Sequence, residues 1–528
     1  MLLALLALLA CDGSPPPEEI AFCTSDLAYA YDPEVEVETF PDDWWTVPDD
    51  TTATGLRVSL PDDALLTDDY SNLLTQLNSL DGFGMTPAIV LRFHGIVDPA
   101  ALEVRVLAQT DAGWEEHPAT LGSLDGGYTL TVSPWSPLPP ASRVVVGVRS
   151  TTDTCIAPSP TLKTLLQGEG TLAPRYAEGL DALGWGPEDV GAMVVFTTQS
   201  LTVDAAVAAD IAARDITLDA PMTCTDGASW RDCEGTVTVA DYRVDGVVPD
   251  EPVAVRSTYA LPLTAWIPLD VPGPWPVVLC GHGLAGDRFQ CDFLADLAAP
   301  QGIAVLAVDA QESGDHPART AGDDELDQIM ALFGFTLTPP SLDALVLRDN
   351  FRASAWDKLQ ILRAVELGMD LDGDGTVDLD ADHVQYAGAS LGGIMGPELM
   401  AWADVDAGML AVPGGGLMNL VLDSDTFGII ATAMTPDDWN EDDLLRSIPM
   451  VQTLIDAGDP LVHAAEITRR RATAEGPDVV MLMAVGDTIV PNSSTVALAS
   501  AFGVAGVGPE SVPVPGVVFG DEIGRAHV

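Results

Sequence analysis

Gly388-Ala389-Ser390-Leu391-Gly392-Gly393 lies between a short apolar stretch, 384–387, and a segment with the composition of a helix, 394–402. A serine placed between a strand and a helix in a Gly-x-Ser-x-Gly pattern is typical of a nucleophile elbow. The turn there is sharp and strained, and the glycines on either side remove β-carbons that would clash. The pattern is frequent by chance, so other segments have to support Ser390 as a nucleophile.

Acyl transfer also needs hydrogen-bond donors for the oxyanion that forms on the attacked carbonyl. The backbone N–H of Leu391, directly after the serine, is the first candidate. The second is expected after an earlier strand, where His282-Gly283 stands at the strand end and Leu284 follows. We predict Leu391 and Leu284 as the oxyanion donors, and a structural role for the ring of His282.

A catalytic acid is expected after a later strand. The segment 483–487 has that pattern, with apolar residues, a glycine and Asp487, and a helix start follows at 492–495. Asp487 comes after Ser390 in the chain, as a Ser–acid–His order requires. A loop aspartate taken alone is more often a surface residue, but this position predicts Asp487 as the acid.

The third member of a triad would be a histidine after the acid. His527, the penultimate residue, is the only histidine that follows Asp487. His316 and His463 are fallback candidates for the base, but both precede Asp487, and we expect them to be ordinary loop or helix residues.

A sequencing artefact is a second explanation for the C-terminal residues that contain His527. The hexapeptide 523–528, Ile-Gly-Arg-Ala-His-Val, is also the translation of a common sequencing adapter. We therefore expect the native sequence in this chain to end near Asp521 and the real histidine to lie in a missing tail. A chain without that histidine is expected to be nearly inactive.

The order of strands and helices predicts two domains. From 22 to 200, short strands separated by Pro, Gly and Asp predict a β-sandwich with helical inserts. From 201 to 528, near-continuous apolar strands alternate with helices, which predicts a doubly wound α/β sheet, truncated at its C-terminus. Apolar helical pieces at 417–457 lie where a lid would be expected.

The composition is that of a folded protein with an acidic surface. Apolar residues make up 47% of the chain, and 22 Lys and Arg stand against 80 Asp and Glu, for a formal net charge of -58. Such a surface repels nucleic acid and anionic headgroups, so we expect no nucleic-acid partner.

The N-terminal apolar run ends in Leu8-Leu9-Ala10-Cys11, which resembles the lipobox of bacterial lipoproteins. The run is too short to span a bilayer and lacks a basic n-region, so the natural start is expected upstream of Met1. We predict a signal and tether over 1–21, lipidation of Cys11, and an exported protein anchored to a membrane. A plain secretory signal is the alternative.

Six cysteines remain besides Cys11, an even number that suits disulfides in an exported protein. Proximity in the sequence suggests these pairs: Cys224 with Cys233, Cys280 with Cys291, and Cys23 with Cys155. Six cysteines allow fifteen connectivities, so proximity is the only ground for this pairing.

An acidic loop lies at 370–378, with the sequence Asp-Leu-Asp-Gly-Asp-Gly-Thr-Val-Asp. It matches the first nine positions of an EF-hand-type calcium loop, although position twelve is Ala381 instead of glutamate. Crowded carboxylates repel one another unless a cation is present. We therefore predict a structural Ca²⁺, with a solvated acidic turn as the alternative, and no cofactor required for catalysis. The predicted ligands are Asp370, Asp372, Asp374 and Asp378.

Further motifs occur at 40–44 (Phe-Pro-Asp-Asp-Trp), 80–83 (Leu-Asp-Gly-Phe), 134–138 (Pro-Trp-Ser-Pro-Leu) and 196–200 (Phe-Thr-Thr-Gln-Ser). With 281–283 and 388–393 they resemble the bacterial α/β-hydrolase lipoproteins of the virulence-factor lipase type. The resemblance implies an α/β-hydrolase sheet preceded by an all-β, Ig-like sandwich. It also implies esterase, lipase or lysophospholipase chemistry at the cell surface.

We predict a serine carboxylic-ester hydrolase that forms an acyl-enzyme on Ser390 and acts on an ester or acyl-lipid substrate. Short soluble esters are the alternative within this class. A non-catalytic adhesion or binding lipoprotein on a hydrolase scaffold is the alternative from another class, because fold does not fix function. Acyl-chain and headgroup specificity, the membrane face and the oligomeric state stay open.

Overall fold

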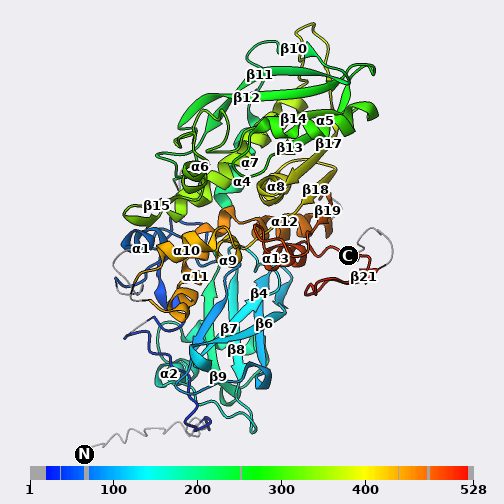
Figure 1. The fold of residues 1–528 in the computed structure, drawn as a ribbon. Coiled ribbons are helices and arrows are strands. Elements are labelled where there is room, and N and C mark those ends of the chain that lie inside the picture. The colour runs from blue at the N-terminus through cyan, green and yellow to red at the C-terminus, as the bar shows by residue number, and fades with distance from the viewer. Residues whose placement is uncertain are drawn as a thin grey trace, which may run out of the picture.

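A computed structural model describes residues 20–35, 37–62, 64, 70–249, 253–437, 439–472 and 476–520. Figure 1 shows these residues as a ribbon. Cys11 and His527 lie outside the described residues. Lipidation of Cys11 and the adapter origin of the last residues therefore stay predictions.

The N-terminal part contains two antiparallel sheets, with the strand orders β3-β7-β6 and β5-β4-β8-β9 (Figure 1). Apolar side chains from both sheets belong to one buried cluster, as a sandwich requires. Its likeness to an Ig domain stays a prediction. The strands are β3 (Ile89–Arg92), β4 (Val104–Thr110), β5 (Gly113–Glu116), β6 (Ala119–Leu124), β7 (Thr129–Pro134), β8 (Arg143–Arg149) and β9 (Val190–Thr197).

Other N-terminal elements differ in part from the sequence-based expectation. Strand β2 (Leu56–Val58) pairs with β1 (Thr46–Pro48) outside the two larger sheets, so not every N-terminal strand belongs to the sandwich. Helices α2 (Pro160–Leu166) and α3 (Ala173–Leu183) lie where helical inserts were predicted. Helix α1 (Ser71–Leu77) was not expected.

The C-terminal part is built on a mixed sheet whose eight described strands run in the order β10-β11-β12-β14-β13-β17-β18-β19. Pairing is antiparallel from β10 to β14 and parallel from β14 to β19, which confirms the predicted α/β sheet. The strands are β10 (Thr223–Asp226), β11 (Trp230–Asp241), β12 (Ser257–Pro268), β13 (Trp275–Gly281), β14 (Ala304–Val308), β17 (Leu379–Ala389), β18 (Ala407–Ala411) and β19 (Asp478–Leu482).

Helices pack on both faces of this sheet. One face carries α5 (Asp292–Ala298), whose Ala295 and Ala298 pack on β12, β13 and β14. Helices on the other face share a second buried cluster with the strands. They are α4 (Thr202–Ala213), α7 (Ala344–Glu366), α8 (Leu391–Trp402), α12 (Pro460–Ala472) and α13 (Asn492–Phe502).

A third group of elements lies between the sheet and the N-terminal strands (Figure 1). The predicted lid segment contributes three of its helices, α9 (Leu417–Asp423), α10 (Gly428–Met434) and α11 (Glu441–Ile455). Helix α6 (Glu325–Leu332) and a hairpin of β15 (Phe335–Leu337) and β16 (Pro340–Leu342) adjoin them. Their apolar side chains belong to the same cluster as the core of the N-terminal sheets, so the two halves of the chain are packed together.

The sheet face under α5 is open towards its β19 edge. The strand register places Cys280, Ala387, Met409 and Val480 in one row across β13, β17, β18 and β19. Cys280 is buried, whereas Met409 and Val480 are each 47% exposed and Leu482 is 48% exposed. Among the described residues, α5 therefore covers one half of this apolar face and nothing covers the other.

All three predicted disulfides are confirmed: Cys23–Cys155, Cys224–Cys233 and Cys280–Cys291. Several disulfides are typical of a protein that folds outside the cytosol, which supports the predicted export. Within the described ranges no single helix has the length and apolarity to cross a membrane. Helices α9 and α10 together meet that test but are bent by 99°.

Candidate active site

Ser390 sits on the turn between β17 and α8, as predicted. Its φ of 52° and ψ of -118° lie in a region that residues other than glycine rarely adopt. The turn is held by the backbone N–H of Ser390, which donates to the carbonyl oxygen of Ala411 on β18 at 2.9 Å. The side chain is partly exposed, and no described residue is hydrogen-bonded to its hydroxyl. The serine is therefore held in a strained, accessible position.

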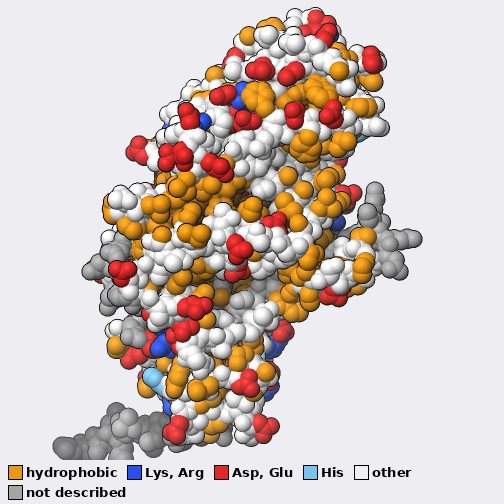
Figure 2. Space-filling model, in the orientation of Figure 1, with side chains coloured by type: hydrophobic (Ala, Val, Ile, Leu, Met, Phe, Trp, Pro, Cys, Tyr) orange, Lys and Arg blue, Asp and Glu red, His pale blue; other side chains and the backbone are white. Residues whose placement is uncertain are grey.

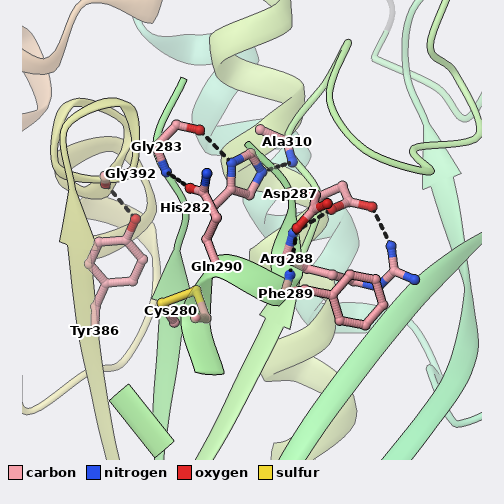
Figure 3. Close-up of a disulfide and its surroundings, with 12 residues drawn as sticks. Cys280, His282, Gly283, Asp287, Arg288, Phe289, Gln290, Ala310, Tyr386 and Gly392 are labelled. Atoms are coloured by element: carbon pink, nitrogen blue, oxygen red, sulfur yellow. Dashed lines mark hydrogen bonds and ion pairs between the residues drawn. A yellow bond between two sulfur atoms is a disulfide. The ribbon is translucent and has the colours of Figure 1, made fainter. Parts of the chain in front are cut away.

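The glycines of the motif allow backbone to approach backbone. A β-carbon on Gly392 would lie 2.1 Å from the carbonyl oxygen of Gly281, and one on Gly388 would lie 2.3 Å from that of Gly392. The first turn of α8 thus rests directly on the ends of β13 and β17. The hydroxyl of the buried Tyr386 donates to the carbonyl oxygen of Gly392 at 2.6 Å and braces the same turn (Figure 3).

The predicted oxyanion loop passes beside Ser390. A β-carbon built on Gly283 would lie 4.0 Å from the β-carbon of Ser390, so the loop backbone runs next to the serine. The backbone N–H groups of Leu284 and Leu391 have no acceptor among the described residues. Both donors are therefore available to an oxygen near Ser390.

His282 has a structural role, as the sequence suggested. Its Nε2 accepts from the backbone N–H of Ala310 at 2.9 Å, so the ring proton is on Nδ1, which donates to the carbonyl oxygen of Gly283 at 2.8 Å (Figure 3). Burial lowers the pKa of His282. With both nitrogens engaged by backbone, this imidazole has no free lone pair for a proton from Ser390.

Gln290 and the Cys280–Cys291 disulfide support the same loop, and the sequence analysis did not assign them this role. The Oε1 of Gln290 accepts from the backbone N–H of Gly283 at 3.1 Å (Figure 3). The disulfide joins the end of β13 to the turn that carries Gln290. Gln290 lies next to Cys291 in the sequence, and that adjacency was the only signal that could have identified it.

Asp487 follows β19 at the same edge of the sheet as Ser390, because β17, β18 and β19 are parallel neighbours. One oxygen, Oδ1, accepts from the backbone N–H groups of Ile489 at 2.9 Å and Val490 at 3.0 Å. The other, Oδ2, accepts from no described residue. The carboxylate is thus fixed in direction and keeps one oxygen free for a partner.

The acid turn is attached to helix α9. The carbonyl oxygen of Thr488 accepts from the backbone N–H of Asp425 at 3.0 Å and from the hydroxyl of Ser424 at 3.3 Å. At its other end α9 begins at Leu417, whose N–H donates to Asp459 Oδ2 at 2.6 Å. Asp459 comes much later in the chain, and no sequence pattern indicated this cap.

None of the six described histidines is hydrogen-bonded to Ser390 or Asp487. His316 is buried, and its Nε2 lies 3.0 Å from Asp357 Oδ2. His463 is also buried, and its Nε2 lies 2.9 Å from the carbonyl oxygen of Ala457. Both are structural residues, as expected. The structure thus brings the predicted nucleophile, oxyanion loop and acid to one edge of the sheet, and within its described part no histidine is hydrogen-bonded to them.

The acidic loop 370–378 is folded as a compact turn. Oxygens of Asp370, Asp372 and Asp374 lie within 4.8 Å of one another. Asp370 accepts from the backbone N–H groups of Gly373 and Gly375, both at 2.7 Å. Asp378 is not part of that cluster and accepts from the N–H of Leu371 at 2.7 Å, and its partial burial raises its pKa. Three of the four predicted ligands are therefore clustered.

Neither a protein-family model nor a curated protein matches this sequence. Among solved structures, an acetyl xylan esterase from Paenibacillus sp. R4 is similar, with 17% identity, a TM-score of 0.38, and coverage of 57% of this chain and 83% of the esterase. Acetyl xylan esterase 1 from Thermoanaerobacterium sp. JW/SL YS485 is also similar, with 17% identity, a TM-score of 0.38, and coverage of 57% of this chain and 82% of the esterase. A CE15 glucuronoyl esterase from Teredinibacter turnerae T7901 has 16% identity and a TM-score of 0.32, with coverage of 55% of this chain and 66% of the esterase. Likeness at this level carries no inference about substrate.

Proposed function

We propose that this protein is a serine carboxylic-ester hydrolase that forms an acyl-enzyme on Ser390. The observation that carries the proposal is the strained, partly exposed Ser390 beside a loop that offers a backbone N–H with no acceptor among the described residues. Strain of this kind costs about 1–3 kcal/mol and persists where the surrounding structure enforces it, often at functional sites. The close approach of Gly281 and Gly392 enforces it here.

The reaction follows from these positions. The Ser390 oxygen attacks the ester carbonyl carbon while its proton passes to a histidine base, and the Leu284 and Leu391 N–H groups stabilise the oxyanion. Collapse of the tetrahedral intermediate releases the alcohol, which takes that proton, and leaves the acyl group on Ser390. Water then hydrolyses the acyl-enzyme by the same steps. Asp487 orients the histidine through its free oxygen.

We propose that the base comes from the chain after residue 520, either from His527 or from the natural tail that the adapter-like hexapeptide replaces. The open half-face at Met409, Val480 and Leu482 supports a tail, because apolar rows of this kind are normally covered. The carboxylate of Asp487 has no hydrogen-bonded base among the described residues, which agrees with a base that comes from the chain after residue 520.

Hydrolysis of p-nitrophenyl butyrate tests the proposal when the natural reading frame after Asp521 has been restored. Activity is expected in that protein, and Ser390→Ala should abolish it; activity in the present chain as well would assign the base to His527. Asp487→Asn should reduce kcat by about 10⁴-fold, the loss that follows when the base takes the wrong tautomer. A restored chain with no histidine after Asp487 and no hydrolysis would favour the adhesion or binding lipoprotein instead.

The lipid anchor at Cys11 is part of the proposal and would hold the enzyme at a membrane surface. It favours acyl lipids over short soluble esters as the natural substrate. A variant with Cys11→Ser should be recovered in the soluble fraction of the producing cells, whereas the natural protein should be recovered with membranes.

We also propose that Asp370, Asp372 and Asp374 bind a structural Ca²⁺, with Asp378 recruited from its contact with Leu371. The crowding of three carboxylates in a turn supports this ion. The loop lies between α7 and β17, so a bound ion would brace the strand that carries Ser390.

A further inference from the structure

The oxyanion loop after β13 turns at Gly283, a residue whose backbone torsions are not restricted by a β-carbon. The peptide group that joins Gly283 to Leu284 is trans. It carries the Gly283 carbonyl oxygen on one side and the Leu284 N–H on the other, so the two groups point in opposite directions. A rotation at Gly283 would therefore redirect the Leu284 N–H, and contacts from outside the glycine have to fix its conformation.

Both polar backbone groups of Gly283 are held by such contacts. Its carbonyl oxygen accepts from Nδ1 of His282 at 2.8 Å and from the N–H of Gly286 at 3.2 Å. Its N–H donates to Oε1 of Gln290 at 3.1 Å (Figure 3). His282 thus fixes the peptide group after Gly283, and Gln290 fixes the peptide group before it.

The side-chain amide of Gln290 packs against the loop at Gly286. A β-carbon on Gly286 would lie 2.2 Å from Cδ and Nε2 of Gln290 and 2.3 Å from its Oε1. The amide therefore occupies the space that a β-carbon would fill. A β-carbon on Gly283 would lie 3.5 Å from Oε1 of Gln290 and 4.0 Å from the β-carbon of Ser390. Gln290 and Ser390 are therefore both next to the same point of the loop.

The turn that carries Gln290 is anchored on both sides. The backbone N–H of Arg288 donates to Oδ1 of Asp309, and Nη1 of Arg288 donates to Oδ2 of Asp309, both at 2.6 Å. Cys291 is bonded to Cys280 on β13. These four anchoring residues are buried, whereas Gln290 is exposed. A buried frame therefore holds one exposed side chain against the oxyanion loop.

We propose that Gln290 is a positioning residue for the esterase reaction, whose amide oxygen fixes Gly283 so that the Leu284 N–H points at the oxyanion. The proposal rests on the proposed function, because it assigns a role in the reaction of Ser390. Gln290 acts through the backbone of Gly283 and is not itself a catalytic residue. Donors that are fixed before the reaction stabilise an oxyanion without reorganising during it.

The neutral charge of this side chain agrees with the role. Figure 2 shows many acidic and few basic side chains at the level of the molecule where Figure 1 labels α5. Gln290→Glu would keep an acceptor for the Gly283 N–H but would add a further negative charge near the developing oxyanion, which it would repel. An amide supplies the acceptor without the charge.

The first test measures hydrolysis of p-nitrophenyl acetate by the restored full-length chain. Gln290→Met keeps the length of the side chain and removes the acceptor, so kcat should fall about 10-fold or more while KM changes less than about 2-fold. Gln301→Met is the matched control, because Gln301 is exposed and its side chain has no hydrogen bond to a described residue. Equal kcat in the two variants, or a loss confined to KM, would overturn the proposal.

Gly286→Ala tests the same contact from the loop side. Its β-carbon should displace the flexible end of Gln290, so kcat should fall as in Gln290→Met with little change in Tm. The double variant should be no slower than either single variant, because both changes remove one interaction. Losses that multiply in the double variant would contradict the role of Gly286 in holding Gln290.

Amide hydrogen exchange at Gly283, measured by mass spectrometry with overlapping peptides, tests the contact without relying on catalysis. Exchange should be about 10-fold or more faster in Gln290→Met than in the natural protein, and should stay slow in Gln290→Glu. Equal exchange in the natural protein and Gln290→Met would overturn the proposal. The expected exchange rates with no hydrolysis by the restored natural protein would overturn the proposed function, and with it the role of Gln290 in the reaction.

Discussion

Gly392 lies so close to Gly281 that a β-carbon on Gly392 would come within 2.1 Å of the carbonyl oxygen of Gly281. This contact seats the first turn of α8 on the end of β13 and brings the oxyanion loop beside Ser390. The obstacle is backbone, which cannot move aside as the end of a side chain can.

Gly392→Ala should therefore destabilise the protein by about 1–3 kcal/mol or more, as overpacking of a tight contact does. It should also displace Ser390 and abolish esterase activity. Urea unfolding measures the first effect. Gly428→Ala is the control, because a β-carbon there meets only an ordinary contact at 3.4 Å in the first turn of α10. Equal stability of the two variants would contradict the close approach.

Replacing Ser390 should reveal the strain of the elbow. Glycine tolerates the φ of 52° that alanine does not, so Ser390→Gly should be more stable than Ser390→Ala by about 1 kcal/mol. Both variants lack the nucleophile, which separates backbone strain from chemistry. Denaturant midpoints of the two variants give the comparison, and a more stable alanine variant would show that the turn is relaxed.

Two buried carboxyls should make the protein more stable in mild acid. Burial raises the pKa of Asp42 to about 7, and burial together with Asp459 raises that of Asp456 to about 7. Between about pH 4 and 7 the folded state therefore binds protons that the unfolded chain has released, so the free energy of unfolding should rise as the pH falls from 7.5 to 5.

Asp42→Asn isolates one of these groups. Its Oδ1 can still accept from the N–H of Trp44, so the fold should persist while part of the pH dependence is lost. The exposed Asp111→Asn serves as control. A Tm that does not change, or that falls, between pH 7.5 and 5 in the natural protein would contradict the raised pKa values.

Calcium should raise the Tm if the acidic loop binds it. Scanning calorimetry with Ca²⁺ and with a chelator measures the shift in Tm. Asp372→Asn should reduce this shift. Asp382→Asn, a change at a neighbouring exposed residue, should reduce the shift less. Stabilisation follows from binding to the folded state alone, and reaches about 2.7 kcal/mol at 100 times Kd. An identical Tm in both solutions would leave the loop as a solvated turn.

The sequence predicted those features that depend on local patterns. The elbow at Ser390, the position of Leu284 and the strand order that places Asp487 all follow from short motifs between apolar strands. Proximity along the chain was enough to pair Cys224 with Cys233, which are neighbours across β10 and β11.

Contacts between distant segments could not be predicted in this way. Tyr70 meets the carbonyl of Met434, 364 residues further on, and Asp456 accepts from the backbone N–H groups of Met85 and Thr86. Such pairs carry no periodicity or spacing, because they arise only once both halves have folded. The packing of α1 against α11 is another contact of this kind and was therefore absent from the sequence-based expectation.

Covalent labelling by a fluorophosphonate probe tests the central claim most directly, because the probe reacts with an activated serine whatever the natural ester is. The restored full-length protein should be labelled at one site, which peptide mass mapping should place at Ser390, and Ser390→Ala should not be labelled. Absence of labelling in a folded, full-length protein that carries a histidine after Asp487 would contradict the assignment of Ser390 as the nucleophile.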